Sequence, residues 1–180
     1  MTFLYFAYGS NMLQARLRAR CPSARLIDRA TAIGFDFEFS KRSIDGSGKA
    51  TLIPTRGVLC PGVIFEISRS EIDQLDRAEG AGAGYERYDD FVAEFAGTGE
   101  QVAVLTYLAN APDHRLKPFD WYLALVIAGA LKNGLCDEHV VRLRLVEYLV
   151  DNQLDRRNRV EAVNALTDEG FADYAGLLMP

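Results

Sequence analysis

Histidine and cysteine are scarce in this sequence of 180 residues, and each shortage excludes a class of site. Two histidines, His114 and His139, leave little material for a histidine-rich metal centre or a Ser-His-Asp triad. The three cysteines form no Cys-x-x-Cys pair. Their odd number and wide spacing predict free thiols in a reducing compartment. Carboxylates, hydroxyls and backbone groups therefore remain as candidates for chemistry.

Positive charge and long apolar runs are also in short supply. Lys and Arg number 20 against 25 for Asp and Glu, and the net charge of −5 makes the chain a poor non-specific binder of nucleic acid or anionic membrane. The longest apolar run, Trp121–Leu131, is shorter than the roughly 20 residues of a spanning helix and predicts a buried helix. The N-terminus lacks the basic region and cleavage site of a signal peptide. We therefore expect a cytoplasmic protein with neither a nucleic-acid nor a membrane partner.

The common motifs for nucleotides and metals fail in this chain. Gly48-Lys49 resembles the end of a P-loop, but Ala50 replaces the hydroxyl residue that binds Mg²⁺. The glycine-rich stretch Gly80–Gly84 follows a predicted helix and precedes a strand, which is the reverse of the dinucleotide-binding order. Neither His-Glu-x-x-His nor an EF-hand loop is present. No metal site and no cofactor are predicted.

The remaining composition predicts one globular domain over residues 1–180, with 49% hydrophobic and 11% aromatic residues. The expected strands are Thr2–Ala7, Arg25–Phe39, Val58–Ile67, Tyr85–Phe95 and Gln101–Leu108. The polar stretch 41–49 predicts a loop, and Pro61-Gly62 predicts an interruption of the third strand. The expected helices are Met12–Arg20, one from Ser68 to Gly80 that begins with a capping box, one after Pro118, one from Asp137 to about Val150, and one over Val160–Leu166. Strands first and helices afterwards favour an α+β fold over an alternating α/β fold.

The first candidate site is the turn Tyr8-Gly9-Ser10-Asn11, which joins a strand to a helix. Unpaired N–H groups at a helix start carry the positive end of the helix dipole. Gly9 allows a ligand to approach the backbone, and Ser10 and Asn11 can cap the helix or donate to a ligand. The turn suits a carboxylate or a developing oxyanion. A plain capped turn is the alternative.

The second candidate is Glu79, which ends an amphipathic helix beside the glycine loop and Tyr85. The negative end of the helix dipole makes a carboxylate at this place a stronger base, which suits general base catalysis. A solvated carboxylate at a helix end is the alternative interpretation. Several tyrosines accompany it, and phenols beside a pocket can hold a substrate and restrict water, although buried tyrosine is most often structural.

Together these segments resemble the γ-glutamylcyclotransferase family, of the kind with a Tyr-Gly-Ser-Asn turn in an AIG2-like barrel. The similarity runs in order through several short segments. They are FLYFAYGSN (3–11), PSA (22–24), GVIFEIS (62–68), LDRAEG (75–80), TYLA (106–109), Pro118 and WYLALVIAGALKNGL (121–135). The set covers residues 3–136, and we expect residues 137–180 to form an additional helical segment.

The resemblance implies a small mixed β-barrel flanked by helices. It implies a metal-independent enzyme without a cofactor, which cyclises a γ-glutamyl amino acid or amine to 5-oxoproline and releases the amino compound. Glu79 falls at the catalytic glutamate. The implied substrate-binding residues are Tyr8, Gly9, Ser10, Asn11, Tyr85 and Tyr122. The partner would be a small γ-glutamyl substrate, as in glutathione metabolism.

The sequence departs from the family in two places. The loop between Glu79 and Tyr85 is one residue shorter than in similar sequences, and the chain after Leu143 has no counterpart. We expect the C-terminal segment to cover the barrel or to mediate a homodimer. The spelling of the turn differs from that of the glutathione-specific branch, which resembles YGSL, and of the γ-glutamylamine branch, which resembles YGTL.

Two other functions stay open from the sequence. In one, the same fold releases a different γ-glutamyl group in a biosynthetic pathway. In the other, the barrel is a non-catalytic binding module, which predicts that Glu79 lies outside the pocket or is ion-paired, for instance with Arg77 or Arg87. For catalysis, Glu79 would take a proton from the substrate's α-amine and return it to the leaving amine.

Overall fold

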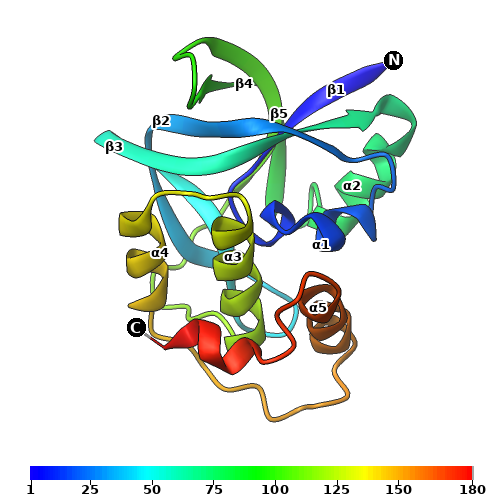
Figure 1. The fold of residues 1–180 in the computed structure, drawn as a ribbon, viewed down its shortest axis with the longest axis vertical. Coiled ribbons are helices and arrows are strands. Elements are labelled where there is room, and N and C mark those ends of the chain that lie inside the picture. Colours follow the sequence, from blue (N-terminus) through cyan, green and yellow to red (C-terminus); the bar gives the residue numbers. More distant parts are fainter. Residues whose placement is uncertain (180) are drawn as a thin grey trace.

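Five strands close into a barrel in the computed structural model, which describes residues 1–179 (Figure 1). The strands are β1 (Thr2–Ala7), β2 (Arg25–Arg42), β3 (Gly48–Ser68), β4 (Tyr85–Phe95) and β5 (Gln101–Ala109), in the order β1-β3-β2-β4-β5. Neighbours are antiparallel except β1 and β5, which close the barrel in parallel through Tyr5 and Leu105. The predicted mixed barrel is confirmed.

Helices flank this barrel: those from residue 120 onward gather at one end, and the pair over residues 69–79 lies at its side, near the N-terminus (Figure 1). They are η1 (Ser10–Met12), α1 (Gln14–Arg18), η2 (Arg69–Glu71), α2 (Ile72–Glu79), α3 (Asp120–Lys132), α4 (Asp137–Arg144), α5 (Arg157–Asp168) and η3 (Tyr174–Leu178). No helix in the described part of the chain is long and apolar enough to cross a membrane.

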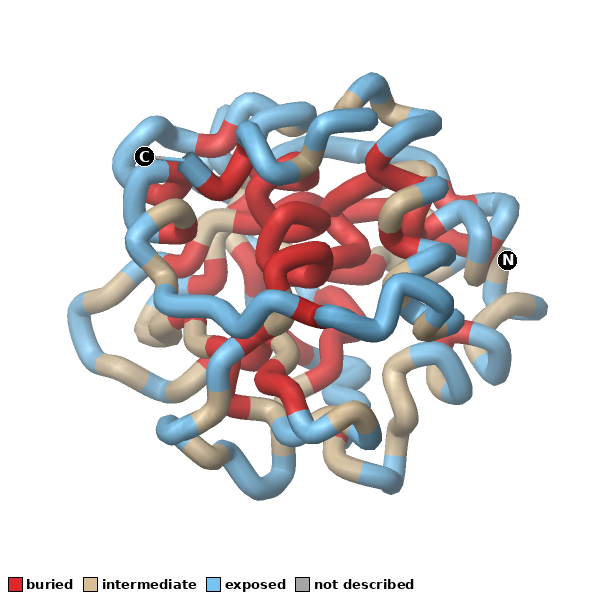
Figure 2. The backbone as a smooth tube through the Cα atoms, turned by 90° about the horizontal axis from the view of Figure 1, so that it is seen from below, coloured by how far each residue is buried: buried red, intermediate tan, exposed pale blue. Residues whose placement is uncertain are grey.

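Helix α3 is the centre of the helical layer, because its sequence is apolar on every side (Figure 2). The elements η1, α4, α5 and η3 pack around it. Its Tyr122 reaches the barrel, where it contacts the Phe39 ring of β2 and accepts a hydrogen bond from the Ala50 N–H of β3. Gly129 permits the closest approach, since a Cβ there would lie 2.7 Å from the Cβ of Met12. The Asn133 side-chain amide also donates to the Met12 carbonyl at 2.9 Å. These contacts fix the chain directly after the turn that ends β1.

The C-terminal segment packs onto the rest of the chain. Helix α5 contacts α1 and α3, and η3 lies along α3. Leu177 and Leu178 are buried, and Phe171 and Tyr174 are partly buried against the same core. The C-terminal segment therefore covers the helical layer.

Strands β2 and β3 are longer and less interrupted than the sequence predicts. Both run into the expected loop of residues 41–49, and β3 continues through Pro61-Gly62, which pair with β2. Gly62 lies beneath the Phe6 ring, and a Cβ there would lie 2.5 Å from that ring. The glycine thus admits a core aromatic ring from β1, and the predicted interruption is wrong.

Two predicted helix features are also wrong. Ser68 makes no capping hydrogen bond, because its hydroxyl pairs with the Ser70 hydroxyl at 2.8 Å. The Glu71 carboxylate, the other half of the expected box, accepts a 2.7 Å hydrogen bond from the Ser23 hydroxyl. Helix α4 ends at Arg144 and does not reach Val150. The following segment turns back so that the Leu149 carbonyl accepts a 2.9 Å hydrogen bond from the Asp120 N–H. Pairing of this segment with the start of α3 replaces the further helical turns expected for α4.

Candidate active site

The candidate residues predicted from the sequence come together at the helical end of the barrel. They line one small cavity of about 20 Å³, here called the inner cavity. Its lining is Tyr5, Tyr8, Gly9, Ser10, Asn11, Ala50, Glu79, Tyr85, Tyr107 and Tyr122. The end of β1 with η1, the end of α2, the start of β4 and the helix α3 all contribute to it.

The turn after β1 is held from both sides. A Cβ on Gly9 would lie 2.8 Å from the Cβ of Ala50, so the glycine is required for contact with β3 as well as for access to the backbone. The N–H groups of Ser10 and Asn11 donate to no protein acceptor within residues 1–179. Both residues are buried. The turn therefore presents two unpaired donors beside the cavity.

Glu79 is the last residue of α2, which Gly80 terminates in the left-handed conformation at φ +72°. One carboxylate oxygen, Oε1, accepts hydrogen bonds from Asn11 Nδ2 at 2.8 Å and Arg20 Nη1 at 2.7 Å. The other, Oε2, has no hydrogen-bond partner within the described residues. Glu79 lines the cavity. Its carboxylate is held in position through one oxygen, and the other oxygen stays available for a proton.

Arg20 is the residue that sequence reasoning missed. It also donates to Asn11 Oδ1 at 2.9 Å, so one guanidinium fixes both the carboxylate and the amide of the site. Glu79 is therefore ion-paired, as the binding-module interpretation predicts, but it also lines the cavity, which that interpretation does not predict. Its partner is Arg20 and not one of the two arginines given as examples, of which Arg87 pairs with Asp76 at 2.6 Å. The spacing of Arg16 and Arg20 four residues apart, just after the turn, was the available signal.

The phenols of the site are neutral hydrogen-bonding groups. Tyr8 donates to the Tyr107 carbonyl and Tyr85 to the Ala50 carbonyl, while the Tyr122 oxygen accepts a 3.2 Å hydrogen bond from the Ala50 N–H. Burial raises the pKa of four lining tyrosines, namely Tyr5, Tyr8, Tyr85 and Tyr122. The site therefore carries its negative charge on Glu79 and not on a phenolate.

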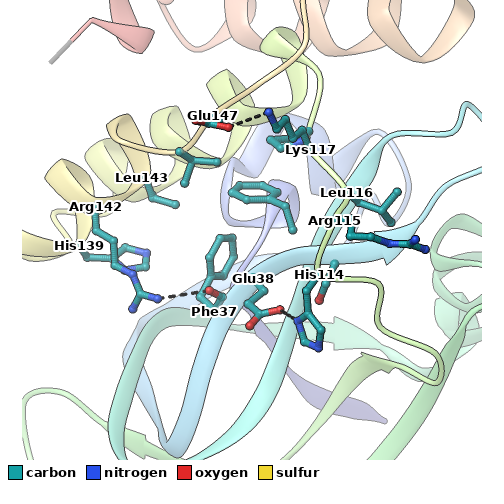
Figure 3. Close-up of a pocket in the computed structure, with 14 residues that line it drawn as sticks. Phe37, Glu38, His114, Arg115, Leu116, Lys117, His139, Arg142, Leu143 and Glu147 are labelled. Carbon is teal, nitrogen blue, oxygen red and sulfur yellow. Dashed lines mark hydrogen bonds and ion pairs between the residues drawn. The ribbon is translucent and has the colours of Figure 1, made fainter.

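A separate cavity of about 450 Å³ lies between β2, α4 and the loop before α3 (Figure 3). It contains none of the predicted site residues, and its rim charges pair with each other, Lys117 with Glu147 and His114 with Glu38, both at 2.7 Å. It is therefore larger than the inner cavity but lacks a free carboxylate positioned for proton transfer. We therefore take the inner cavity as the candidate active site, although the cavity of Figure 3 is larger.

An enclosed pocket with one anchored carboxylate, neutral phenols and free backbone donors is that of a small-molecule enzyme working by proton transfer. Similarity to known proteins specifies the class further. The sequence model of the family described as "Gamma-glutamyl cyclotransferase, AIG2-like" matches residues 5–123. The chain belongs to this family.

Individual relatives agree with this placement. The chain is 31% identical over 152 residues to the human protein named γ-glutamylcyclotransferase, covering 81% of this chain and 79% of the human one. The bovine protein of the same name is 30% identical over 152 residues, with the same coverage. A solved structure named γ-glutamyl cyclotransferase superposes with a TM-score of 0.82 at 26% identity, covering 91% of this chain and 99% of that one. Because 91% of 180 residues extends past Leu143, the expectation that the chain after Leu143 has no counterpart is wrong for part of that segment.

Proposed function

We propose that the chain is a γ-glutamylcyclotransferase that converts a γ-glutamyl amino acid or amine into 5-oxoproline and the free amino compound. The observation that carries the proposal is the half-anchored carboxylate of Glu79. Arg20 and Asn11 fix Oε1, Oε2 accepts no hydrogen bond within residues 1–179, and Glu79 lines the cavity together with the turn of Gly9 and Ser10.

The reaction needs one base and one acid, and Glu79 serves as both in turn. The substrate's α-amine nitrogen attacks its own γ-carbonyl carbon, and the five-membered ring closes as this new C–N bond forms. Glu79 takes the proton that the amine loses and gives it to the leaving nitrogen, whose bond to the carbonyl carbon breaks. No other reactant is needed.

The surrounding groups bind and orient the substrate. The N–H groups of Ser10 and Asn11 supply donors to a substrate oxygen. Tyr85 and Tyr122 lie at the boundary with a neighbouring cavity and limit access of water. Holding the γ-glutamyl chain folded contributes further, because ring closure is intramolecular and depends on orientation.

The decisive experiment replaces Glu79→Gln, which keeps the shape and removes the base. We expect the rate of 5-oxoproline formation, measured by chromatography, to fall by about a thousandfold. Glu86→Gln, on the exposed side of β4, is the matched control and should keep the wild-type rate. A Glu79→Gln protein with a wild-type rate would refute Glu79 as the base, whereas a wild-type protein that forms no 5-oxoproline would favour the non-catalytic module.

Partner and compartment belong to the same proposal. We place the chain in the cytoplasm, where Cys21, Cys60 and Cys136 would stay reduced. A homodimer is supported by exposed apolar side chains between α4 and α5. These are Leu145, Tyr148, Leu149, Val150 and Leu154. Sedimentation velocity would distinguish a dimer from a 20.0 kDa monomer.

A further inference from the structure

Next to the inner cavity lies a second cavity of about 130 Å³, here called the outer cavity. The two are continuous, since Ser10, Glu79, Tyr85 and Tyr122 line both. Four cationic side chains also line the outer cavity, and Glu79 is its single carboxylate. The cations are Arg16, Arg20, Lys41 and Lys49.

Two of these cations are matched by acids. Arg20 is balanced by Glu79 at 2.7 Å, and Lys49 by Asp45 at 3.1 Å, with a further hydrogen bond from Lys49 Nζ to the Ser47 hydroxyl. These pairs need no ligand to complete them.

The other two cations are incompletely matched. The Arg16 side chain is 8% exposed, its Nη1 approaches Glu161 at 3.4 Å, and its buried Nε has no hydrogen-bond partner within residues 1–179. Lys41 forms no ion pair in the same part of the chain, and its ammonium lies 4.6 Å from the centre of the Tyr85 ring. A desolvated, weakly paired cation is costly, and an anion placed beside it lowers that cost.

The electrostatics agree with this geometry. Burial lowers the pKa of Arg16 to about 10, with Arg20 adding repulsion, and burial lowers the pKa of Lys41. Burial also lowers the pKa of Lys49 to about 8, which Asp45 opposes and neighbouring cations reinforce. Crowded, desolvated cations are stabilised by an anion that enters among them.

We propose that the outer cavity binds an acidic amino acid as the leaving half of the substrate, with its two carboxylates at Arg16 and Lys41. This inference rests on the proposed cyclisation, which places the scissile bond at Glu79. The leaving half then extends from Glu79 into the outer cavity. A γ-glutamyl amine would bring no anion to these cations, and a neutral amino acid would bring one.

Space for the leaving half continues beyond the outer cavity. A groove of about 570 Å³ between α1 and α5 shares Arg16, Arg20, Ala78 and Asn158 with it. Asn158 belongs to α5, so the C-terminal segment forms part of the wall along which the leaving half would lie. This gives the segment a place in substrate recognition as well as in packing.

The test compares three substrates that release the same product, 5-oxoproline. They are γ-glutamyl-glutamate, its isosteric amide γ-glutamyl-glutamine, and γ-glutamyl-propylamine. For the wild-type protein we expect kcat/KM for the glutamate compound to exceed that for the glutamine compound about tenfold, mainly through KM, and the amine to be the poorest.

Variants assign the preference to residues. Lys41→Met should bring the glutamate-to-glutamine ratio to within about twofold of one, and Arg16→Gln should do the same. Lys117→Met, which removes an exposed lysine paired with Glu147, is the matched control and should keep the wild-type ratio. Lys41 is only half-buried, so its variant should fold even if the Arg16 variant does not, and thermal unfolding checks both.

The outcomes separate this inference from the proposed function. Turnover with equal or better use of the glutamine compound, or an unchanged ratio in Lys41→Met, overturns the acidic leaving half and leaves the cyclase intact. If no compound yields 5-oxoproline, the cyclisation itself fails. Calorimetry of the glutamate and glutamine compounds on the Glu79→Gln protein then decides whether the outer cavity still prefers the dianionic group.

Discussion

The inner and outer cavities are neighbours of opposite character. The inner one is lined by neutral phenols whose hydroxyls are already engaged, Tyr8 with the Tyr107 carbonyl and Tyr85 with the Ala50 carbonyl. The outer one is lined by cations, of which Arg16 and Lys41 are incompletely paired. A satisfied network keeps a fixed geometry, whereas unmatched charge is available to a ligand.

This difference separates two tasks that one pocket must perform. Ring closure requires a base at a fixed position, which Arg20 and Asn11 give to Glu79, while the wall of engaged phenols adds no further charge. Selection of the leaving group requires groups whose interaction differs among substrates. Changes to the inner cavity should therefore affect every substrate alike, and changes to the outer cavity should alter the preference among them.

After removal of the base at Glu79, the largest expected effect comes from adding a methyl group at Gly9, where the wall of the inner cavity has no spare room. Gly9→Ala would bring a Cβ to 2.8 Å from that of Ala50, and such overpacking costs about 1–3 kcal/mol. Displacement of the turn by a fraction of an ångström should lower kcat/KM about a hundredfold for all three substrates. The measurements are thermal unfolding and 5-oxoproline release.

The second-site change Ala50→Gly sharpens this prediction. It removes the atom that the new methyl group meets, so the double variant should recover most of the lost stability and rate. A double variant as impaired as Gly9→Ala would show that ligand access at the backbone, and not contact with β3, makes glycine necessary there.

The inner cavity was predictable from sequence to a degree that the outer one was not. The turn and Glu79 lie in short ordered segments, and a turn or a helix end places its own residues by local geometry. The apolar run of Trp121–Leu131 likewise predicts a buried helix, because no face of it can lie in water. These features depend on neighbours in the chain.

The outer cavity depends on residues far apart in the sequence. Arg16 follows the first turn, Lys41 and Lys49 lie at the end of the β2–β3 hairpin, and Asn158 comes from α5. Nothing local to any one of them distinguishes it from a surface residue. The failed capping box has the same origin, since Glu71 binds Ser23 across 48 positions. Which distant residue a side chain pairs with depends on the tertiary fold, and the spacing of residues along the sequence does not predict it.

Arg20 lines the outer cavity but binds Glu79, which lines both cavities. Replacing Arg20 therefore tests whether it acts on the base or on the leaving group. Arg20→Met would leave Glu79 Oε1 with Asn11 as its remaining partner. Loss of a hydrogen bond from a charged donor is worth about 1.5–3 kcal/mol, so kcat should fall at least about tenfold. Because the arginine fixes the base, the fall should be equal for acidic and neutral leaving groups. A change in the substrate ratio instead would show that Arg20 also acts on the leaving group, as proposed for Arg16 and Lys41.

The smallest expected effect is a pH dependence confined to the outer cavity. Burial lowers the pKa of Lys49 to about 8, against the opposing charge of Asp45, whereas burial raises the pKa of the inner phenols. Lys49 also faces the like charges of Arg16 and Lys41. As pH rises from 7 to 9, Lys49 loses its proton and its positive charge, while the inner phenols stay neutral.

The preference for γ-glutamyl-glutamate over γ-glutamyl-glutamine should therefore fall about threefold between pH 7 and pH 9. The ratio cancels ionisation of the substrate's attacking amine, which both compounds share. Lys49→Arg keeps its charge throughout this range and should reduce the fall. If the variant loses the preference as steeply as the wild type, Lys49 is not the titrating group, and Lys41, whose pKa burial also lowers, becomes the one to replace next.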